Sequence, residues 1–373
     1  MNRRRNVPPA PPVFQLLSDR EDLRQQFAYI GLAGGPSRAA RSAVDQLAVT
    51  IRDLDMEFTS NELESAFKFY SIHKSASEGP CNRYGNIFAF DRTAVSVSVG
   101  TTPESDADTG KGLYLNANIV ADGKGSWWAA SQAPTPHTFN TYFHAILSRS
   151  ATRRHDALFP SAEAASEGGS TRPKVAMIVQ LTGWFDGKVA KADNYLPKLG
   201  KPAIFHPPHG ISSSPIELAL IDAQPDPQMT RSTLRLSSDG GESMTLHHFL
   251  FHAWPDHGVP TTNEDIKALK QLLNTTSELQ REEQCEIYVN CSAGIGRTGT
   301  FIALWSLLKP PMFVDPAFRM KPRSALKPLP SWASGDEVAE TVDTLREQRG
   351  MMCQTQSQIE FIYWMTGLKP ARP

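Results

Sequence analysis

Hydrophobic residues recur at two different spacings along the chain, and the spacing changes near Pro80. Before Pro80, residues 19–33 and 37–55 show the three-to-four-residue spacing of helices that bury one face. Residues 61–70 continue that spacing, with Asn61 as the N-cap. After Pro80 the apolar segments are shorter and are separated by turn residues, which is typical of strands. The pattern therefore predicts a helical lead-in followed by a sheet.

Strand and helix patterns alternate from Pro80 to the end of the chain without a clean linker. Residues 175–181 form an apolar run bounded by turn residues, which fits a strand buried on both faces. We therefore predict one large α/β domain. The expected strands are 87–90, 94–99, 114–120, 175–181, 216–221, 230–236, 244–253 and 286–289. The expected helices are 139–147, 264–280, 297–308, 336–349 and 355–366.

Composition excludes several classes of protein. The 373 residues include 38 Lys and Arg against 39 Asp and Glu, a net charge of −1, whereas nucleic-acid binding usually needs a strongly basic face. Hydrophobic residues make up 40% of the chain, enough for a sizeable core. The four cysteines are too few for a disulfide framework, and no His and Cys set has metal-ligand spacing. We therefore expect no metal, no cofactor and no nucleic-acid partner.

Nothing in the sequence predicts a membrane anchor. Residues 1–5 are basic and 8–12 are rich in proline, without the apolar segment of a signal peptide. The longest apolar run, 301–308, is far shorter than the ~20 residues that a membrane span requires. We expect a cytoplasmic protein, with the nucleus as a second compartment.

Residues 289–301 carry the strongest chemical signal. A predicted strand enters this segment, a loop of small residues follows, and a helix leaves it. Such a loop points backbone N–H groups and a helix N-terminus at one place, which makes an anion site. Cys291 starts the loop, where that field favours the thiolate. Arg297 ends it and can bind two phosphate oxygens. The segment predicts a nucleophile aimed at a bound phosphate.

The spacing of Cys291 and Arg297 is weak evidence by itself. A cysteine six residues before an arginine arises by chance in about one such chain in four. A buried structural cysteine beside a surface arginine would explain the pair equally well. The small residues between them, with a strand before and a helix after, favour the catalytic interpretation.

Several segments resemble the phosphotyrosine-specific protein tyrosine phosphatases and occur in that family's order. Residues 291–299, Cys-Ser-Ala-Gly-Ile-Gly-Arg-Thr-Gly, match its signature loop. The string Trp-Pro-Asp-His-Gly-Val-Pro at 254–260 resembles the loop that carries the general acid, and Asn-Arg-Tyr at 82–84 resembles the phosphotyrosine-recognition loop. Further resemblances are Tyr-Leu-Asn-Ala-Asn at 114–118, Ser-Gln-Ala-Pro at 131–134 and Gln-Thr-Gln-Ser-Gln at 354–358.

The resemblance spans nearly the whole chain and implies a single domain with a twisted, mixed β-sheet flanked by helices. We therefore divide the chain into a flexible basic and proline-rich arm (1–18), a helical lead-in (19–55) and a catalytic domain (56–370). Two biased stretches, 149–172 and 310–334, are interpreted as exposed insertions.

The resemblance also implies a two-step phosphoryl transfer. Cys291 would attack phosphorus while Arg297 and the loop amides hold the oxygens. Asp256, in the loop that begins at Trp254, would protonate the leaving tyrosine oxygen and then activate water. Gln354 would position that water.

Other residues matched by the resemblance would bind substrate or assist. The Thr298 hydroxyl would help the intermediate to break down, and Gln358 would act beside Gln354. Tyr84 would wall the pocket and stack on the substrate ring. Asn86 stands where the family usually has an aspartate that binds the peptide backbone. The loop residues that would contact the phosphate are Ser292, Ala293, Gly294, Ile295 and Gly296.

Three supporting positions bear on how well the site works. Asn290 replaces the histidine that normally precedes the nucleophile, so we predict a higher Cys291 pKa than is usual in the family. Asp186 falls where the family usually has a glutamate that orients the arginine, and Lys191 falls at a lysine that organises the acid loop. Charges at a hairpin tip would explain these last two equally well.

Two alternatives remain open at this point. A phosphotyrosine-binding pseudophosphatase would be favoured by Asn290 alone, and a dual-specificity or lipid phosphatase is disfavoured by Tyr84. The expected partners are phosphotyrosyl proteins, and we expect a monomer. Arg3-Arg4-Arg5 ahead of Phe14 and Leu16 loosely resembles a kinase-docking pattern, which would make a kinase a substrate; a solvated arm is the simpler interpretation.

Overall fold

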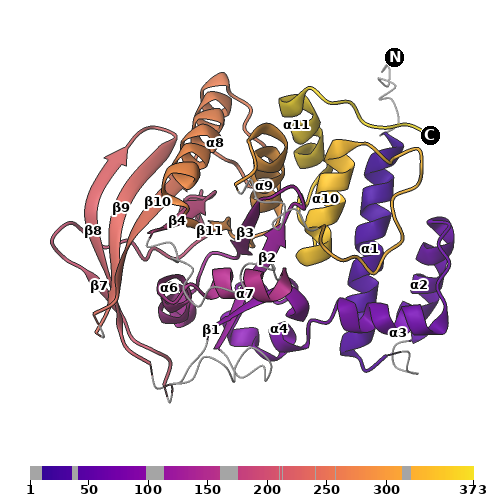
Figure 1. Ribbon diagram of the computed structural model, residues 1–373, viewed down its shortest axis with the longest axis horizontal. Coiled ribbons are helices and arrows are strands. Elements are labelled where there is room, and N and C mark those ends of the chain that lie inside the picture. Colours follow the sequence, from indigo (N-terminus) through magenta and orange to yellow (C-terminus); the bar gives the residue numbers. More distant parts are fainter. Residues whose placement is uncertain are drawn as a thin grey trace, which may run out of the picture.

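A large mixed sheet forms the centre of the molecule (Figure 1). The computed structural model describes residues 11–35, 41–97, 113–159, 175–209, 211, 213–239, 241–256, 258–312 and 321–373. Within these residues nine strands pair in the order β1-β2-β3-β11-β4-β10-β9-β8-β7. Their bounds are β1 (Ala94–Val97), β2 (Leu113–Ala121), β3 (Trp127–Ser131), β4 (Val175–Gln180), β7 (Ala203–Phe205), β8 (Ile216–Pro225), β9 (Met229–Ser238), β10 (Ser243–Phe251) and β11 (Glu286–Asn290). A separate hairpin joins β5 (Phe185–Asp186) and β6 (Val189–Ala190).

The middle of the sheet is parallel and its two sides are antiparallel. Strand β11 pairs in parallel with β3 and β4, and β4 pairs in parallel with β10. Strands β1, β2 and β3 on one side, and β10, β9, β8 and β7 on the other, are antiparallel neighbours. The carboxyl end of β11, which leads directly into Cys291, therefore lies at the centre of the sheet, where ligands bind in many α/β proteins.

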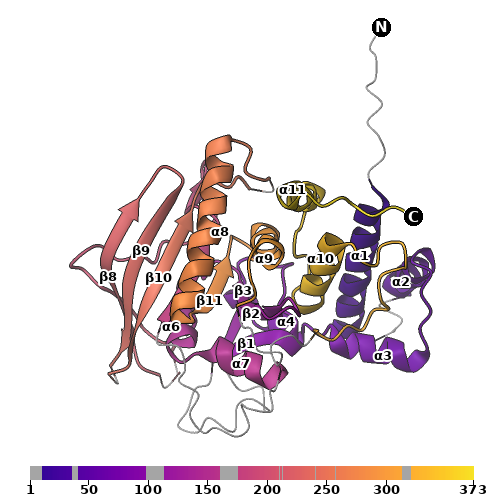
Figure 2. The ribbon, with the colours of Figure 1, turned by 45° about the horizontal axis from the view of Figure 1, so that its top comes forward.

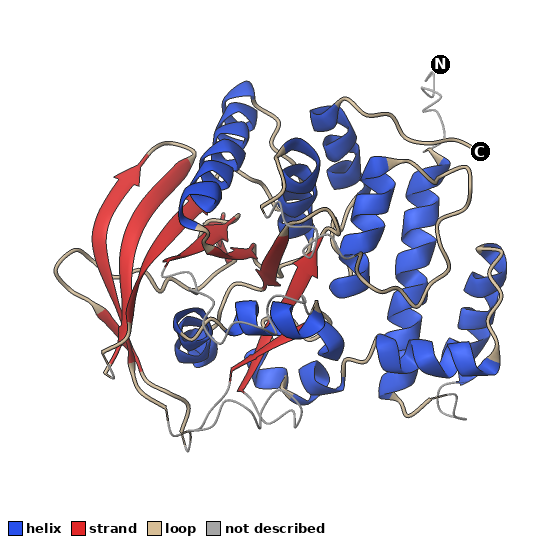
Figure 3. Ribbon diagram, viewed as in Figure 1, coloured by secondary structure: helices blue, strands red, loops and turns tan. Residues whose placement is uncertain are grey.

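Helices cover both faces of the sheet (Figures 1 and 3). On one side α8, α9, α10 and α1 follow one another from left to right, with α11 beside α9 and α10 (Figure 2). Helices α6 and α7 lie on the other side. The helix bounds are α1 (Pro12–Leu32), α2 (Arg41–Asp53), α3 (Ser60–Phe69), α4 (His73–Ser77), α6 (Phe139–Leu147), α7 (Ser150–Leu158), α8 (Asn263–Glu283), α9 (Gly296–Leu308), α10 (Glu337–Gln348) and α11 (Gln356–Thr366). Short 3-10 turns occupy Gly79–Cys81, Asp91–Thr93 and Pro136–Thr138.

Strand β4 contributes side chains to two hydrophobic cores, one on each face of the sheet. Met177 and Val179 pack into the cluster under α8, α9 and α10, whereas Ile178 between them packs against α6. Side chains alternate across a strand, so an apolar run such as this one buries both faces. The prediction of a doubly buried strand at 175–181 is confirmed.

The N-terminal boundary predicted from the sequence is wrong. Helix α1 begins at Pro12, seven residues before the expected start at Asp19, because proline suits the first turn of a helix. Its first turns enter the same hydrophobic core as α9 and α10 through Val13, Phe14 and Leu17. Residues 12–18 are therefore no solvated arm, and the buried Phe14 is not displayed for docking a kinase. Residues 1–10, with the three arginines, lie outside the described residues.

Charged contacts join α1 to α10 within the core. Arg20 makes a two-bond contact with Asp343, at 2.9 and 2.8 Å, and Arg24 contacts both Asp343 and Glu347. Burial alone would raise the pKa of Asp343, but the two guanidinium groups hold it well below its usual range. These groups are almost fully buried, so each depends on its partner.

A second set of contacts joins α1 to the segment after α10. Arg346 donates to the Leu17 carbonyl (2.6 Å) and to the Met352 carbonyl (2.8 Å). The Met351 amide donates to Glu21 Oε1 at 2.8 Å. The lead-in is thus packed into the same unit as the C-terminal helices.

Other expectations need smaller corrections. Residues 87–90 form no strand, and 149–172 is not wholly an exposed insertion, because α7 occupies its first part and buries Ser150, Ala151 and His155. The sequence does not predict strand β3, because its residues do not alternate between apolar and polar. All of them are buried in the structure. Residues 160–174 and 313–320 lie outside the described residues. None of the described helices combines the length and apolar character needed to cross a bilayer.

Candidate active site

The loop between β11 and α9 has a shape that depends on glycine. Gly294 has a φ of +73°, and a Cβ there would lie 2.0 Å from the Ser131 carbonyl oxygen of the neighbouring strand. Only glycine can occupy this position without moving backbone. The turn brings the Gly294 amide to 3.3 Å from the Cys291 sulfur, to which it donates.

Arg349 braces this loop from behind. Its Nε donates to the Gly294 carbonyl (2.7 Å) and its Nη2 to the Ala293 carbonyl (3.0 Å). The guanidinium is held in turn by Asn118 Oδ1 (2.7 Å) and Asn116 Oδ1 (2.8 Å) of β2. Because Arg349 binds these carbonyls, the loop amides are free to serve an anion. Sequence reasoning missed Arg349; the available signal was the pair of asparagines two residues apart in an otherwise apolar strand.

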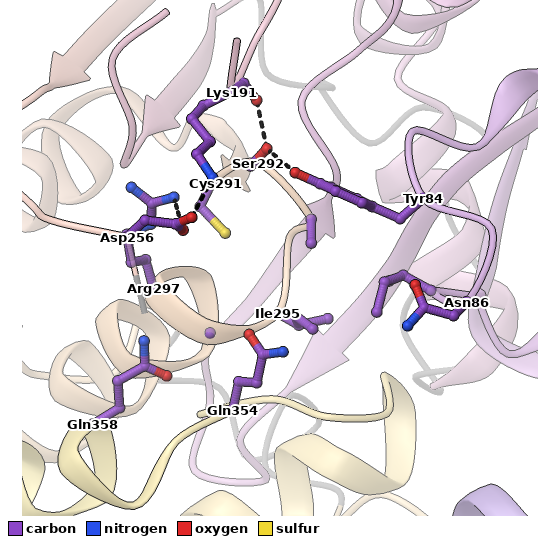
Figure 4. A pocket seen from close by; sticks show the side chains of 13 residues that line it. Tyr84, Asn86, Lys191, Asp256, Cys291, Ser292, Ile295, Arg297, Gln354 and Gln358 are labelled. Carbon is purple, nitrogen blue, oxygen red and sulfur yellow. Dashed lines mark hydrogen bonds and ion pairs between the residues drawn. The ribbon is translucent and has the colours of Figure 1, made fainter. Parts of the chain in front are cut away.

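A cavity of about 230 Å³ opens above this loop (Figure 4). Most of the residues singled out from the sequence line it, although they come from segments far apart in the chain. The lining residues are Tyr84, Asn86, Ile87, Lys191, Asp256, Cys291, Ser292, Ala293, Ile295, Gly296, Arg297, Gln354 and Gln358. Gly294, Thr298, Asn290, Asp186 and Trp254 do not line it.

Cys291 is buried at the floor of the cavity, with a relative exposure of 3%. Burial by itself raises the pKa of a thiol, but the charge of Arg297 and hydrogen bonds from Thr298 and the Ile295 amide outweigh it, so the Cys291 pKa is lowered. Thr298 Oγ1 is buried without a hydrogen-bond partner among the described residues, and its effect on Cys291 is to lower the pKa of the thiol. The site therefore favours the thiolate form of Cys291.

Arg297 is held by contacts from two segments. Its Nη1 donates to Thr182 Oγ1 (3.1 Å) and to the Trp254 carbonyl (3.0 Å), and its Nη2 donates to Asp256 Oδ1 (2.9 Å). Lys191 forms an ion pair with the same carboxylate. Arg297 and Lys191 thus both contact Asp256, the residue predicted from the sequence to be the general acid.

Asp186 does not fit the role expected for it. It lies in the β5–β6 hairpin, where it is exposed, and no described contact joins it to Arg297. Thr182, two residues after the end of β4, supplies the side-chain oxygen that Arg297 binds. The hairpin pairs Asp186 with Val189 at its tip, so the carboxylate is carried into solvent rather than toward the cavity.

A comparison with protein families identifies the family to which this chain belongs. The family model described as "Protein-tyrosine phosphatase" matches residues 79–153 and 171–366. The chain belongs to the protein-tyrosine phosphatase family. The match begins after α3, so the lead-in helices lie outside the part that the family model describes.

Individual relatives of this phosphatase chain are distant. Receptor-type tyrosine-protein phosphatase F of Rattus norvegicus is 28% identical over 288 residues, which are 76% of this chain and 12% of the relative. Tyrosine-protein phosphatase 2 of Schizosaccharomyces pombe is 26% identical over 313 residues, 83% of this chain and 37% of the relative. The chain thus spans only a minor part of the length of these relatives.

Solved structures share the fold of this phosphatase domain. The protein tyrosine phosphatase TbPTP1 of Trypanosoma brucei superposes with a TM-score of 0.54 at 22% identity, covering 79% of this chain and 83% of that one. TcPTP1 of Trypanosoma cruzi gives 0.55 at 21% identity, covering 80% and 87%. The expected fold, a twisted, mixed sheet flanked by helices, is confirmed.

Tyr84 forms one wall of the phosphatase cavity (Figure 4). The Tyr84 hydroxyl is 2.7 Å from Ser292 Oγ. The Ser292 hydroxyl in turn donates to the Lys191 carbonyl at 2.5 Å. The preceding Arg83 binds the carbonyls of Ala133 (3.2 Å) and Pro134 (3.1 Å), which fixes the segment. Asn86, farther along, is exposed at the rim.

The two glutamines of the phosphatase differ in burial. Gln354 is exposed at the edge of the cavity, where its side chain is accessible to water. Gln358 is buried in the first turn of α11, where its Oε1 accepts a hydrogen bond from the Thr355 amide at 3.3 Å. A Cβ on Gly296 would lie 3.0 Å from the Gln358 side chain, so Gln358 packs directly on the start of α9.

Asn290 is buried behind the nucleophile. Its Nδ2 donates to the Cys291 carbonyl at 3.3 Å, and its Oδ1 has no hydrogen-bond partner among the described residues. The amide supports the backbone at Cys291 without a charge of its own. Within the same described residues, no group of three or more His, Cys, Asp and Glu side chains is arranged to hold a metal ion.

Proposed function

We propose that this chain hydrolyses phosphotyrosine in protein substrates through a cysteinyl-phosphate on Cys291. The observation that carries the proposal is the single cavity shared by Cys291, Arg297, Asp256 and Tyr84. A lowered thiol pKa, a guanidinium and an acid within one cavity supply the nucleophile, the phosphate-binding group and the proton donor. The names of the relatives support tyrosine dephosphorylation.

The chemistry divides into two balanced steps. In the first, the Cys291 sulfur bonds to phosphorus, the phosphorus–oxygen bond to tyrosine breaks, and protonated Asp256 gives its proton to the leaving phenolate oxygen. In the second, water attacks phosphorus, the phosphorus–sulfur bond breaks, and the Asp256 carboxylate takes a proton from that water. Arg297 exchanges its contact with Asp256 for phosphate oxygens, and Gln354 positions the water.

The depth of the cavity supports selectivity for phosphotyrosine. Cys291 is buried at the floor, and the Tyr84 ring stands as a wall between it and solvent. A phenyl ring carries its phosphate farther from the peptide backbone than a serine side chain does, so it reaches the floor and stacks on Tyr84. Phosphotyrosyl proteins are therefore the proposed partners, and a monomer suffices because every proposed site residue comes from one chain.

Phosphate release from a phosphotyrosyl and a phosphoseryl peptide, measured with a metal chelator present, tests the proposal. We expect turnover of the first peptide only. Cys291→Ser should abolish it, whereas Asp186→Asn, a matched exposed control, should leave it unchanged. Tight phosphotyrosine binding without turnover would instead indicate a pseudophosphatase, and equal turnover of both peptides a dual-specificity phosphatase.

A further inference from the structure

A series of hydrogen bonds links four buried residues, His248, Tyr195, Gln180 and Thr182, to Arg297, and it passes through the main-chain carbonyl of Thr182. The Tyr195 hydroxyl is 2.9 Å from His248 Nε2 and 3.0 Å from Gln180 Oε1. Gln180 Nε2 donates to the Thr182 carbonyl at 2.9 Å, and Thr182 Oγ1 accepts from Arg297 at 3.1 Å. All four are at most 2% exposed, and none lines the cavity.

The hydrogen bonds of this series can have only one assignment of donors and acceptors. The Thr182 carbonyl can only accept, so the atom of Gln180 facing it must be the amide nitrogen. The Gln180 oxygen therefore faces Tyr195, whose hydroxyl must donate to it. The single proton of that hydroxyl is used in the bond to Gln180, so the Tyr195 oxygen can only accept from His248. His248 must therefore donate to it from Nε2.

Burial keeps His248 in the form that this assignment requires. Burial lowers the pKa of His248 to about 3, so the ring is neutral and carries a single proton. With that proton on Nε2, Nδ1 is the unprotonated nitrogen, and it is buried without a hydrogen-bond partner among the described residues. These hydrogen bonds thus fix the orientation of the Gln180 side-chain amide.

Thr182 occupies a particular place among the groups that hold Arg297. The other two contacts, from Asp256 and the Trp254 carbonyl, both come from the acid loop. Asp256 must also face the leaving oxygen during the proposed reaction, so its contact with Arg297 cannot persist throughout. The Thr182 hydroxyl is the described contact of Arg297 that is independent of the acid loop.

Gln180 is also in register with the residue before the nucleophile. Gln180 and Asn290 are paired residues of β4 and β11, and the Leu181 amide donates to the Asn290 carbonyl at 2.7 Å. A shift of Gln180 would therefore move the end of β4 that leads into Thr182, beside the strand that leads into Cys291.

We propose that Gln180 is a positioning residue, which fixes Thr182 through its carbonyl so that the Thr182 hydroxyl aims Arg297 at the phosphate. This inference rests on the proposed function of the same cavity. A polar residue at position 180 is costly unless both of its amide atoms are bound, because it lies fully inside the core. Both amide atoms of Gln180 are bound here, and its Nε2 binds Thr182, the residue that contacts Arg297.

The test compares Gln180→Met, which keeps the volume, with Thr182→Val, which removes the Arg297 acceptor. Each should lower kcat/KM for a phosphotyrosyl peptide about tenfold, the range for one hydrogen bond. The affinity for inorganic phosphate as a competitive inhibitor should fall by a similar factor. The double variant should be no worse than Thr182→Val alone. Gln280→Met, a buried glutamine in α8, is the matched control and should match wild type.

Additive losses in the double variant, or unchanged phosphate affinity in Gln180→Met, would overturn the proposal. If Gln180→Met does not fold, Gln180→Glu keeps the shape, and only its protonated form can donate to the Thr182 carbonyl. Its activity relative to wild type should then fall as pH rises, whereas a flat ratio would count against the proposal. Absence of turnover in wild type would instead defeat the proposed function, and phosphate binding measured by calorimetry would still test Gln180.

Discussion

Arg297 donates from Nη2 to Asp256 Oδ1 across 2.9 Å, so the cation proposed to bind phosphate and the proposed acid are in direct contact. Lys191 is ion-paired with the same carboxylate. Under the proposed function, phosphate and Asp256 compete for one guanidinium, and substrate binding must release Asp256 from Arg297.

Asp256→Asn should lower kcat by about 10²- to 10⁴-fold, because a phenolate must then leave without a proton donor. KM should change little, since Arg297 and the loop amides still bind the phosphate. Steady-state kinetics on a phosphotyrosyl peptide measure both constants. Asp186→Asn should behave like wild type, and an equal loss in that exposed variant would contradict the assignment of the acid.

Asn290→His should lower the Cys291 pKa further, because an imidazolium beside the thiol favours the thiolate. The rate of iodoacetamide alkylation against pH reports that pKa. The other buried thiols do not interfere near neutral pH, because burial raises the pKa of Cys285 and of Cys353 to about 12. Coincident curves for wild type and variant would show that the missing histidine has no effect on the nucleophile.

Gly294→Ala should abolish phosphatase activity and weaken the fold. The added Cβ would lie 2.0 Å from the Ser131 carbonyl oxygen, and neither backbone can give way without moving a strand or the loop. Gly187→Ala is the matched control, because Gly187 has a φ of +58° with no atom within 4 Å of a Cβ. The control should lose only about 1 kcal/mol to backbone strain. Thermal unfolding and activity of the two variants separate these costs.

Glu286 should make stability depend on pH at the end of β11 farthest from Cys291. Burial raises its pKa from 4.5 to about 6, against the opposing hydrogen bond from the Thr152 hydroxyl at 2.6 Å. The native state therefore binds the proton more tightly than the unfolded chain does. This contribution is complete below pH 4.5 and is lost as the pH rises through about 6.

Relative to Glu286→Gln, wild type should lose about 2 kcal/mol of unfolding free energy between pH 4 and pH 7. Urea unfolding at several pH values measures this difference. Glu282→Gln, an exposed neighbour, should show no such dependence. A constant difference between wild type and Glu286→Gln across that range would contradict the prediction.

The parts of the site that are contiguous in sequence could be predicted. The strand, the small-residue loop and the helix around Cys291 are neighbours in the chain, and local rules specify them. Asp186 shows the limit of such prediction. Its spacing from Lys191 fits the family pattern, but the sequence does not show that the β5–β6 hairpin places its carboxylate in solvent. Thr182 and Gln180 could not be found in the same way, since their importance arises only when β4, β10 and β11 are side by side.

The lead-in shows a related limit. Arg20 and Asp343 are 323 residues apart, and nothing near Arg20 in sequence indicates a buried partner. A basic, proline-rich start with a helix behind it suggests a solvated arm, and only the folded core reveals that Phe14 and Leu17 are covered.

The contacts of α1 set the smallest fragment that can carry this chemistry. The family match begins at residue 79, yet Met351 and Arg346, just ahead of Gln354, are bound by Glu21 and Leu17. A fragment cut at the family boundary would remove the partners of Asp343 and Glu347, uncover the core-facing side of α10 and leave the glutamine segment without its support. Expression fragments and truncation experiments on this phosphatase should therefore retain the chain from Pro12 onward.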